Sequence, residues 1–363
     1  MAIHEVVDTT QLTEEQIFKG SIYQFYAFDI GDDVHLEKIK NSDQITIKQR
    51  ALPDYLKTYH KPLTIDIKSV SDKAECIYAN IHHFGVVSFV YKVPFKGTLT
   101  QLRDKLNNMY EDLQRDSVQD AKRVFEVIKD TVTQPVFYHL RNKYFVAQID
   151  PEPTMIDTAL LRDRFGGTIA SALRFEKTNI STFQLEDILE SATGYYRNDL
   201  VIIDTEAAFV YDKEPQELLD FFEIAMVQQL ELRYFDKLLD GKLDAIYSRT
   251  LKKASLVAYL PFIGTTYDPI SELSKLRVDI SVITERLENS IKTVGEAYYS
   301  EIYHLLVEKL EIESWKRSIE KKLSIVHEVR TIYQTQISSI RHDMMNVLII
   351  ILIFTELVVA LIK

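Results

Sequence analysis

The chain has 363 residues, of which 46% are hydrophobic, and only 10 glycines and 9 prolines, so it is expected to fold and not to be disordered. Its formal net charge of −11 at pH 7 argues against nucleic acid as a direct general ligand, because contacts to phosphates need clustered lysine and arginine. A single cysteine, Cys76, excludes an internal disulfide framework and a multi-cysteine metal site.

Residues 1–60 are predicted to form an N-terminal leader with short strands. Alternation and aromatic content predict a strand over residues 22–28, residues 45–47 are a second short candidate, and Pro53 is expected to open a helix. The first residues are acidic and lack a basic region followed by an apolar core. We therefore expect neither an export signal nor a mitochondrial presequence.

An α/β domain is predicted over residues 61–212, where segments rich in β-branched and aromatic residues alternate with segments of helical spacing. The predicted strands cover residues 63–67, 76–81, 84–93, 144–149, 200–203 and 207–211, the last two as a hairpin. The predicted helices cover residues 99–128, 155–174 and 183–189. Pro94 is expected to end the third of these strands, and Gly166 with Gly167 is expected to interrupt the second helix.

Residues 213–343 are predicted to form a helical domain with a coiled-coil-like stalk. Apolar residues recur at spacings of three and four over residues 215–257, a loop is expected at 261–269, and a second helix is expected at 270–310. From Ile312 onward the chain contains neither glycine nor proline, which favours one continuous helix. The predicted fold class is α+β: an N-terminal mixed α/β sandwich domain, then a long-helix bundle or stalk, then one C-terminal transmembrane helix.

The last helix carries a heptad pattern. Its members, spaced alternately by four and three residues, are Ile319, Leu323, Val326, Arg330, Tyr333, Ile337, Ile340 and Met344. This spacing is typical of a coiled-coil seam, in which a polar residue such as Arg330 can fix register or oligomer state, and it predicts a homo-oligomer. The alternative is an intramolecular seam that packs on the two preceding helices in an antiparallel bundle. Both arrangements can hold at once.

Residues 344–362 are predicted to cross a membrane. These 19 residues carry one ionisable side chain and, at about 1.5 Å per residue, reach about 28 Å, close to the hydrocarbon thickness of a bilayer. The side chains expected within the bilayer include Met344, Val347, Ile351, Phe354, Glu356 and Ile362. The alternative is a hydrophobic helix buried in the core of an oligomer. Glu356 either faces a partner or water, or reaches the headgroups of the far interface.

Motifs assign no catalytic, cofactor-binding or metal-binding residue, and we expect no cofactor. The sequence has no Gly-x4-Gly-Lys-Ser/Thr loop, no Gly-x-Gly-x-x-Gly and no His-Glu-x-x-His. His82 and His83 are adjacent beside a strand, where neighbouring side chains point to opposite faces and chelate poorly together. Asp204, Glu206 and Asp212 form an acidic group that is either a solvated turn or a catalytic or metal site.

Two features could bind anions. A basic patch is predicted on the last helix and consists of Lys316, Arg317, Lys321 and Lys322. It is either a solvated, ion-paired helix face or a site for RNA or anionic lipid. Gly166 and Gly167 follow a charged stretch and form either a flexible turn or an anion cradle.

The helical half also carries a series of short motifs in a fixed order. The series runs through Gln229–Asp240 with Arg233, Asp236 and Asp240, then Glu285 with Arg286, Tyr298–Tyr303, Trp315, and Leu348–Ile353 followed by Glu356, with Phe84–Val87 upstream. Over residues 75–363 the chain resembles the "required for meiotic nuclear division" family, whose domain has no known function. The resemblance implies a membrane-anchored protein that self-associates, with no established enzymatic activity. It also implies a link to translation, because mitochondrial members tether ribosomes to the inner membrane.

We therefore expect a non-enzymatic, tail-anchored protein that self-associates through its helical half and acts as a scaffold or tether at the cytoplasmic face of a membrane. Lacking a presequence, it resembles a bacterial-type member, which favours the bacterial inner membrane over the mitochondrial one. The alternative is a factor that tethers ribosomes or RNA, with the ribosome or another protein as partner. A hydrolase using Asp204 and Glu206 is less favoured. A magnesium channel of the CorA type is disfavoured as well, because such channels have two spans and a Gly-Met-Asn signature that is absent here.

Overall fold

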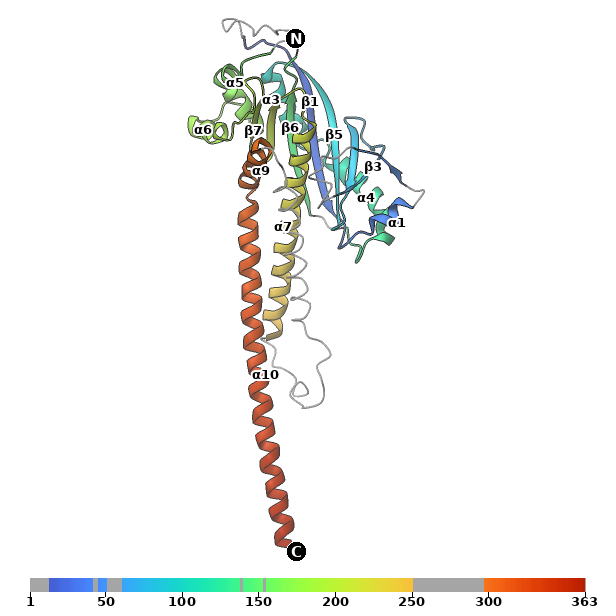
Figure 1. Ribbon diagram of the computed structural model, residues 1–363, viewed down its shortest axis with the longest axis vertical. Helices are drawn as coiled ribbons and strands as arrows, with labels where there is room; N and C mark the ends of the chain where they lie inside the picture. The colour runs from blue at the N-terminus through green and yellow to red at the C-terminus, as the bar shows by residue number, and fades with distance from the viewer. Residues whose placement is uncertain are drawn as a thin grey trace. The chain divides into compact units, whose positions relative to one another are not determined.

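One long strand, β1 (Phe18–Asp29), lies inside an eight-stranded sheet (Figure 1). The computed structural model describes residues 13–41, 45–50, 61–137, 140–152, 155–250 and 297–362. The chain divides into two compact units, Met1–Tyr234 with Thr284–Glu313 and Phe235–Ile283 with Ser314–Lys363. The mixed α/β domain, the helices after it and the α+β class predicted from the sequence are confirmed.

The sheet is built outward from β1. β1 pairs antiparallel with β5 (Val86–Gly97) on one side and with β6 (Arg141–Ile149) on the other. The strand order is β2-β3-β4-β5-β1-β6-β8-β7, and the β6–β8 pairing is parallel. The other strands are β2 (Thr46–Ile47), β3 (Leu63–Asp66), β4 (Glu75–Ile81), β7 (Leu200–Ile203) and β8 (Ala207–Tyr211). The predicted strands and the β7–β8 hairpin are thereby confirmed.

The strand predicted over residues 22–28 is the middle of β1, which is almost entirely buried. Its neighbours β5 and β6 come from the predicted α/β domain. The predicted boundary between residues 60 and 61 therefore separates β1 along the sequence from the strands that flank it in space.

The expectation that Pro94 ends its strand is wrong, because β5 continues to Gly97. The pairing of β5 with β4 begins at Lys92, so beyond Lys92 one side of β5 is a sheet edge. A proline, which has no N–H, is tolerated at such an edge because no ladder hydrogen bond is lost there. On its other side Pro94 remains in register with Ser21 of β1.

Four helices cover one face of the sheet. They are α3 (Leu99–Met109), α4 (Gln114–Ile128), α5 (Thr158–Leu173) and α6 (Thr182–Glu190). Alternate residues of β1, including Ile22, Tyr26 and Phe28, pack into the apolar core beneath them. The ring of Phe18 meets Phe165 of α5 edge-on, with centroids 5.9 Å apart. The short α1 (Leu36–Lys40) and the 3-10 helix η1 (Lys129–Thr131) complete this part of the chain.

Two sequence predictions for these helices are wrong, one about residues 99–128 and one about Gly166 and Gly167. The helix predicted over residues 99–128 is two helices, α3 and α4, separated by residues 110–113. The predicted interruption at Gly166 and Gly167 is wrong, because α5 runs through both. A Cβ at Gly166 would lie 3.0 Å from Leu189 Cδ1, so this glycine allows α6 to pack closely on α5. A helix interior offers no turn that could cradle an anion.

The opposite face of the sheet is covered by the first part of α7 (Gln216–Thr250), as far as Tyr234. The ring of Phe222 on α7 stacks on Tyr144 of β6, with centroids 5.5 Å apart. α9 (Ala297–Lys309) packs on α7, where Tyr303 Oη donates to Gln228 Oε1 at 2.6 Å. The sheet is therefore enclosed between two helical layers.

The second unit contains the rest of α7, from Phe235, and α10 (Ile312–Ile362) from Ser314. The prediction of one continuous helix from Ile312 is confirmed as far as Ile362. The helix predicted over residues 215–257 is confirmed as far as Thr250. The helix start at Pro53, the loop at 261–269 and most of the helix at 270–310 lie outside the described residues.

Replacement of Gly20 by alanine should destabilise the sheet, because a Cβ on β1 would lie 1.9 Å from the backbone oxygen of Gln148 on β6. Overpacking against a backbone atom costs about 1–3 kcal/mol. Gly167→Ala is the matched control, since nothing lies within 4 Å of its Cβ position and alanine suits a helix interior better by about 0.5–1 kcal/mol. Denaturant unfolding should show opposite signs for the two variants, and equal effects would contradict this packing.

Candidate functional site

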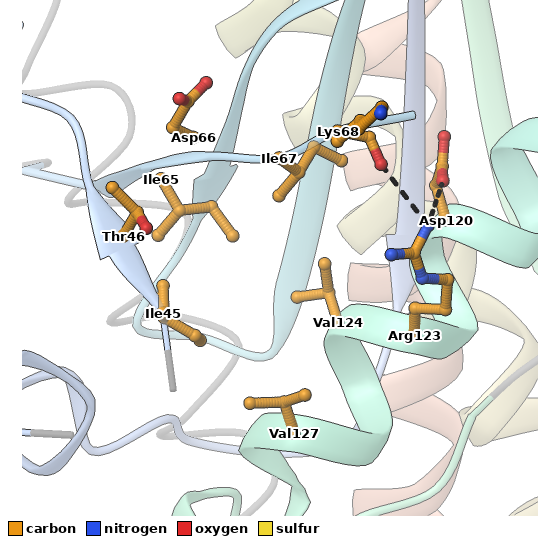
Figure 2. A pocket seen from close by; sticks show the side chains of 10 residues that line it. All are labelled: Ile45, Thr46, Ile65, Asp66, Ile67, Lys68, Asp120, Arg123, Val124 and Val127. Carbon is orange, nitrogen blue, oxygen red and sulfur yellow. Dashed lines mark hydrogen bonds and ion pairs between the residues drawn. The ribbon is translucent and has the colours of Figure 1, made fainter. Parts of the chain in front are cut away.

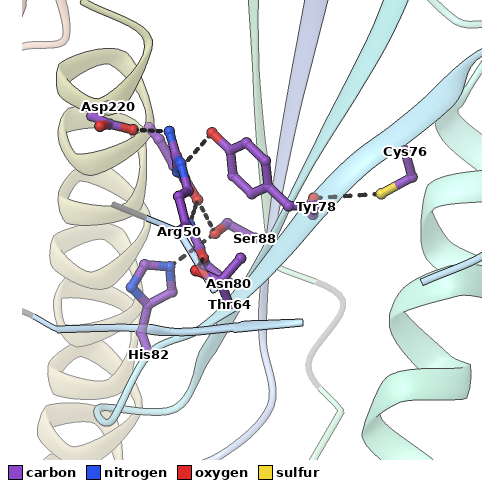
Figure 3. Close-up of polar contacts among 9 residues, drawn as sticks. Arg50, Thr64, Cys76, Tyr78, Asn80, His82, Ser88 and Asp220 are labelled. Carbon is purple, nitrogen blue, oxygen red and sulfur yellow. Dashed lines mark hydrogen bonds and ion pairs between the residues drawn. The ribbon is translucent and has the colours of Figure 1, made fainter. Parts of the chain in front are cut away.

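A cluster of buried polar side chains joins the sheet to α7 (Figure 3). Thr64, Asn80 and Ser88 form a row across three strands, because Thr64 pairs with Asn80 and Asn80 pairs with Ser88. Thr64 Oγ1 donates to Asn80 Oδ1 at 2.7 Å. Glu223 on α7 then accepts at Oε1 from Asn80 Nδ2 at 2.8 Å and from Ser88 Oγ at 2.5 Å. One carboxylate thus ties the polar row of the sheet to the helix.

His82 lies at the end of this hydrogen-bonded row. Its Nε2 is 2.8 Å from Ser88 Oγ. Since the single hydroxyl proton of Ser88 is directed to Glu223, the histidine nitrogen must be the donor, so His82 carries its proton on Nε2. A nucleophilic serine needs the histidine between itself and the acid, whereas here the serine lies in the middle. This order of contacts does not activate Ser88.

Arg50 supplies the positive charge of the cluster. Its side chain is 12% exposed, pairs with Asp220, lies 3.8 Å from Glu223 Oε2 and covers the ring of Tyr78 at 4.0 Å. Burial raises the pKa of Asp220 to about 7, and Arg50 offsets only part of this effect. One cation therefore faces two buried carboxylates, and the nearby Glu223 adds to the rise in the pKa of Asp220.

A second pair of buried acidic residues joins α7 to β1. Glu231 is 2% exposed, and Asp29, at the end of β1, is 1% exposed. Burial raises the pKa of both carboxyls, and the nearby Asp32 raises them further. Asp29 Oδ1 accepts from the backbone N–H of Gly31 at 3.1 Å, whereas the buried Glu231 Oε1 has no hydrogen-bond partner among the described residues. The folded state therefore favours the protonated form of this pair.

Cys76 is a buried free thiol at the edge of the polar cluster (Figure 3). Its Sγ donates to the backbone oxygen of Tyr78 at 3.4 Å. Burial raises the pKa of the thiol to about 12. Because the thiolate is the reactive form, this cysteine is inert in the folded chain.

A cavity of about 220 Å³ opens between β2, β3 and α4 (Figure 2). Five of its ten lining residues are aliphatic and five are polar or charged, and the latter include Asp120 and Arg123 of α4. The buried Asp120 carboxylate accepts from Ser69 Oγ at 2.6 Å, from the Val70 N–H at 3.0 Å and from Tyr91 Oη at 2.9 Å. These donors belong to the chain itself, so Asp120 fixes the segment after β3 onto α4.

The predicted acidic group of Asp204, Glu206 and Asp212 is divided among different partners. Asp204 is fully buried and pairs with Arg174 Nε at 2.6 Å, and burial raises its pKa. Glu206 lines a cavity of about 390 Å³ and accepts from Tyr110 Oη at 2.6 Å. Asp212 accepts from the backbone N–H of Glu214. In the described residues no group of three His, Cys, Asp or Glu side chains is placed to hold a metal ion.

Among the helices that the structure describes, one segment is apolar enough to span a membrane, His342–Ile362 at the end of α10. None of its apolar window is buried, and the predicted span residues Met344, Val347, Ile351, Phe354, Glu356 and Ile362 all belong to this segment. At about 1.5 Å per residue its 21 residues reach about 31 Å, enough to cross the hydrocarbon layer. The length and the exposed, mostly apolar surface agree with the predicted span.

The proximal part of the predicted seam packs within the second unit. Ile319 and Val326 are buried, Leu323 is half-buried, and Val326 forms a small apolar cluster with Leu243 of α7. The intramolecular alternative therefore accounts for the stripe as far as Val326. The side chains of Arg330, Tyr333, Ile337 and Ile340 lie outside the described part of the structure.

The predicted basic patch on α10 is partly neutralised. Lys322 Nζ lies 2.8 Å from Asp236 Oδ1 and 2.6 Å from Asp240 Oδ1, both on α7 in the same unit. Lys321 is exposed, and Lys316 and Arg317 belong to the same stretch of helix. This ion pairing reduces the positive charge available to RNA or lipid.

The described residues of the family-like motif contact different elements and do not form one site. Asp236 also accepts from Ser318 Oγ at 2.7 Å, so it binds α10 at two points. Arg233 Nη1 donates to Asn142 Oδ1 at 3.4 Å, and Trp315 is half-buried. Glu285 and Arg286 lie outside the described residues.

Sequence reasoning missed the cluster around Glu223. Arg50 and Asp220 are 170 residues apart, so no local pattern joins them. A signal was present in α7, however: Asp220, Glu223 and Glu231 recur on one face of an apolar helix. Acidic side chains at core-facing positions indicate buried partners.

A family model described as "Uncharacterized protein MJ0711, N-terminal domain" matches residues 19–217, more than half of the chain. This chain belongs to that family. The match to the MJ0711 N-terminal domain runs from β1 to the start of α7. It includes the polar row of the sheet but ends before Asp220 and Glu223.

A curated relative, Uncharacterized protein MJ0711 of Methanocaldococcus jannaschii, is 24% identical over 197 residues. The aligned part is 54% of this chain and 59% of the relative, so the chain covers less than two thirds of the relative's length. No solved structure matches the chain.

Replacement of Glu231 by glutamine should reduce the loss of stability at high pH. Both carboxyls of the Asp29–Glu231 pair have a raised pKa in the folded state, so the stabilising protonated form is lost as pH rises from about 4 through the raised values. Glutamine is neutral at every pH. Denaturant unfolding between pH 4 and pH 9 should show Glu231→Gln more stable than the parent at high pH, with the difference vanishing near pH 4.

Glu186→Gln is the control, because Glu186 is an exposed glutamate on α6. It should leave the pH dependence unchanged. An unaltered slope in Glu231→Gln would show that this pair is not protonated in the folded chain.

Proposed function

We propose that this protein is a membrane-anchored, non-enzymatic scaffold or tether that α10 holds at a membrane and that presents its α/β unit to a partner. The observation that carries the proposal is the exposed apolar segment His342–Ile362. A surface helix in water keeps a polar face. A helix with apolar side chains on all sides therefore needs an apolar environment, either protein or lipid. A bilayer covers such a segment along its whole length.

The second part of the proposal is self-association through α10. Glu356 lies inside the apolar segment, where a carboxyl is costly in hydrocarbon and usually faces a partner or water. A second copy of the same helix could supply that partner. The stripe up to Val326 is engaged within one chain, so assembly would use the part of α10 nearer its end.

The contacts of the buried polar groups support a binding role more than a catalytic one. Ser88 is not in the order that activates a nucleophile, and Asp204 is buried against Arg174. The resemblance to the "required for meiotic nuclear division" family and its bacterial-type members agrees with this proposal, and its translation link makes the ribosome a candidate partner. The basic patch gives an RNA tether less support, because Lys322 is neutralised.

Ending the chain after Arg341 should release the protein from membranes. The full-length protein should sediment with membranes after an alkaline wash, whereas the shortened form should be soluble, because it lacks the apolar segment. A control replaces residues 342–362 by an unrelated Leu/Ala helix of equal length, which should restore membrane binding. A soluble full-length protein, or a shortened form that stays in the membrane, would reject the anchor.

Light scattering in detergent should separate anchoring from assembly. If Glu356 pairs between copies, Glu356→Leu and the Leu/Ala helix should both remain in the membrane but have a lower mass than the parent. Unchanged mass in both variants would exclude assembly through the apolar segment and leave it as an anchor only.

A further inference from the structure

A basic cavity of about 420 Å³ lies on the sheet where α7 begins. Its lining residues belong to the segment that leads into α7 and to β6, β1 and β5. These three strands are neighbours in the sheet (Figure 1). α7 starts at Gln216, so its covering of the sheet stops there. Beyond that point the same face of the strands carries polar side chains, including Ser21 and Gln148.

Four lysines line this cavity, in a chain whose net charge is −11: Lys19, Lys92, Lys96 and Lys213. The carboxylates there are fewer. Lys213 Nζ pairs with Glu152 Oε1 at 2.6 Å, and Asp150 lines the cavity and accepts from the backbone N–H of Glu152. Glu75 of β4 lies opposite Lys92 but does not line the cavity, so the four lining lysines still outnumber the one lining carboxylate, Asp150.

The register of the strands places these charges against one another. Lys19 of β1 is directly opposite Lys96 of β5, and partners in an antiparallel pair project from the same face. Like charges directly opposite each other are destabilising. Lys92 lies four residues before Lys96, so it shares that face, and its Nζ is 5.7 Å from the ring centre of Tyr23. An anion between these lysines would relieve their repulsion.

We propose that this cavity binds a small, soluble, phosphate-bearing ligand, with its phosphates held by Lys19, Lys92 and Lys96. The volume falls within the range of about 300–1,000 Å³ that is usual for small-ligand sites. Lysine is a common phosphate-binding residue because its ammonium group forms charge-assisted hydrogen bonds to phosphate oxygens. Lys19 and Lys96 lie directly opposite each other and Lys92 lies four residues away along β5 on the same face, an arrangement that suits a ligand with two or three linked phosphates. The site is independent of the apolar segment of α10.

The test is calorimetric titration of inorganic tripolyphosphate into the full-length protein in a neutral detergent at low salt. Binding should be saturable and should weaken as salt rises, because the contacts are ionic. Lys19→Gln with Lys96→Gln should weaken it by about tenfold or more, because two charge-assisted hydrogen bonds to the phosphates are lost. Without ligand this double variant should be no less stable than the parent, because it removes a like-charge pair.

The control variant, Lys38→Gln with Lys177→Gln, removes the same charge from two exposed positions outside the cavity and should bind tripolyphosphate as the parent does. Equal binding by the two double variants would overturn the proposal, as would no binding at low salt. A single-stranded RNA oligonucleotide and vesicles containing phosphatidic acid form separate arms. Binding of either one without binding of tripolyphosphate would also overturn it, in favour of a macromolecular or lipid partner.

Discussion

The position of α7 on the sheet depends on one buried carboxylate, Glu223, which must be hydrogen-bonded where it lies between the two. Glu223 has 3% of its surface exposed, and it accepts hydrogen bonds from Asn80 and Ser88 on neighbouring strands. An unpaired charge in such a place would cost several kcal/mol, so α7 can rotate or slide on the sheet only by breaking these bonds. The polar contact thereby specifies how α7 lies on the strands, whereas apolar packing alone would tolerate several settings.

The two faces of the sheet consequently differ in kind. The face under α3, α4 and α5 is a continuous apolar core, in which aromatic residues such as Phe28 and Phe89 pack ring against ring. The face under α7 mixes apolar stacking, as between Tyr144 and Phe222, with hydrogen-bonded polar groups. Both faces contribute hydrophobic stabilisation, and the hydrogen-bonded groups of the second face add specificity.

Much of the fold was predictable because its signals are local. Strands rich in β-branched and aromatic residues were located correctly, and so were the helices with apolar spacing, except that the helix predicted over residues 99–128 is two helices. Two other errors share a cause: Pro94 and Gly166 were read by their intrinsic preferences, whereas their neighbours in space decide what each one does. The polar cluster around Glu223 and the basic cavity at Lys19 were missed for the same reason. Each brings together residues distant in sequence, which no period of two or 3.6 residues can show.

The state of Cys76 has a practical consequence. Because the only thiol of the chain is buried and its pKa is about 12, alkylating reagents should leave the folded protein unmodified. A cysteine introduced elsewhere, for example on the exposed surface of α10, would then be the single site that takes up a spin label or a fluorophore. The native sequence can thus be labelled at chosen positions without first removing a cysteine, and any labelling of Cys76 itself would report opening of the sheet.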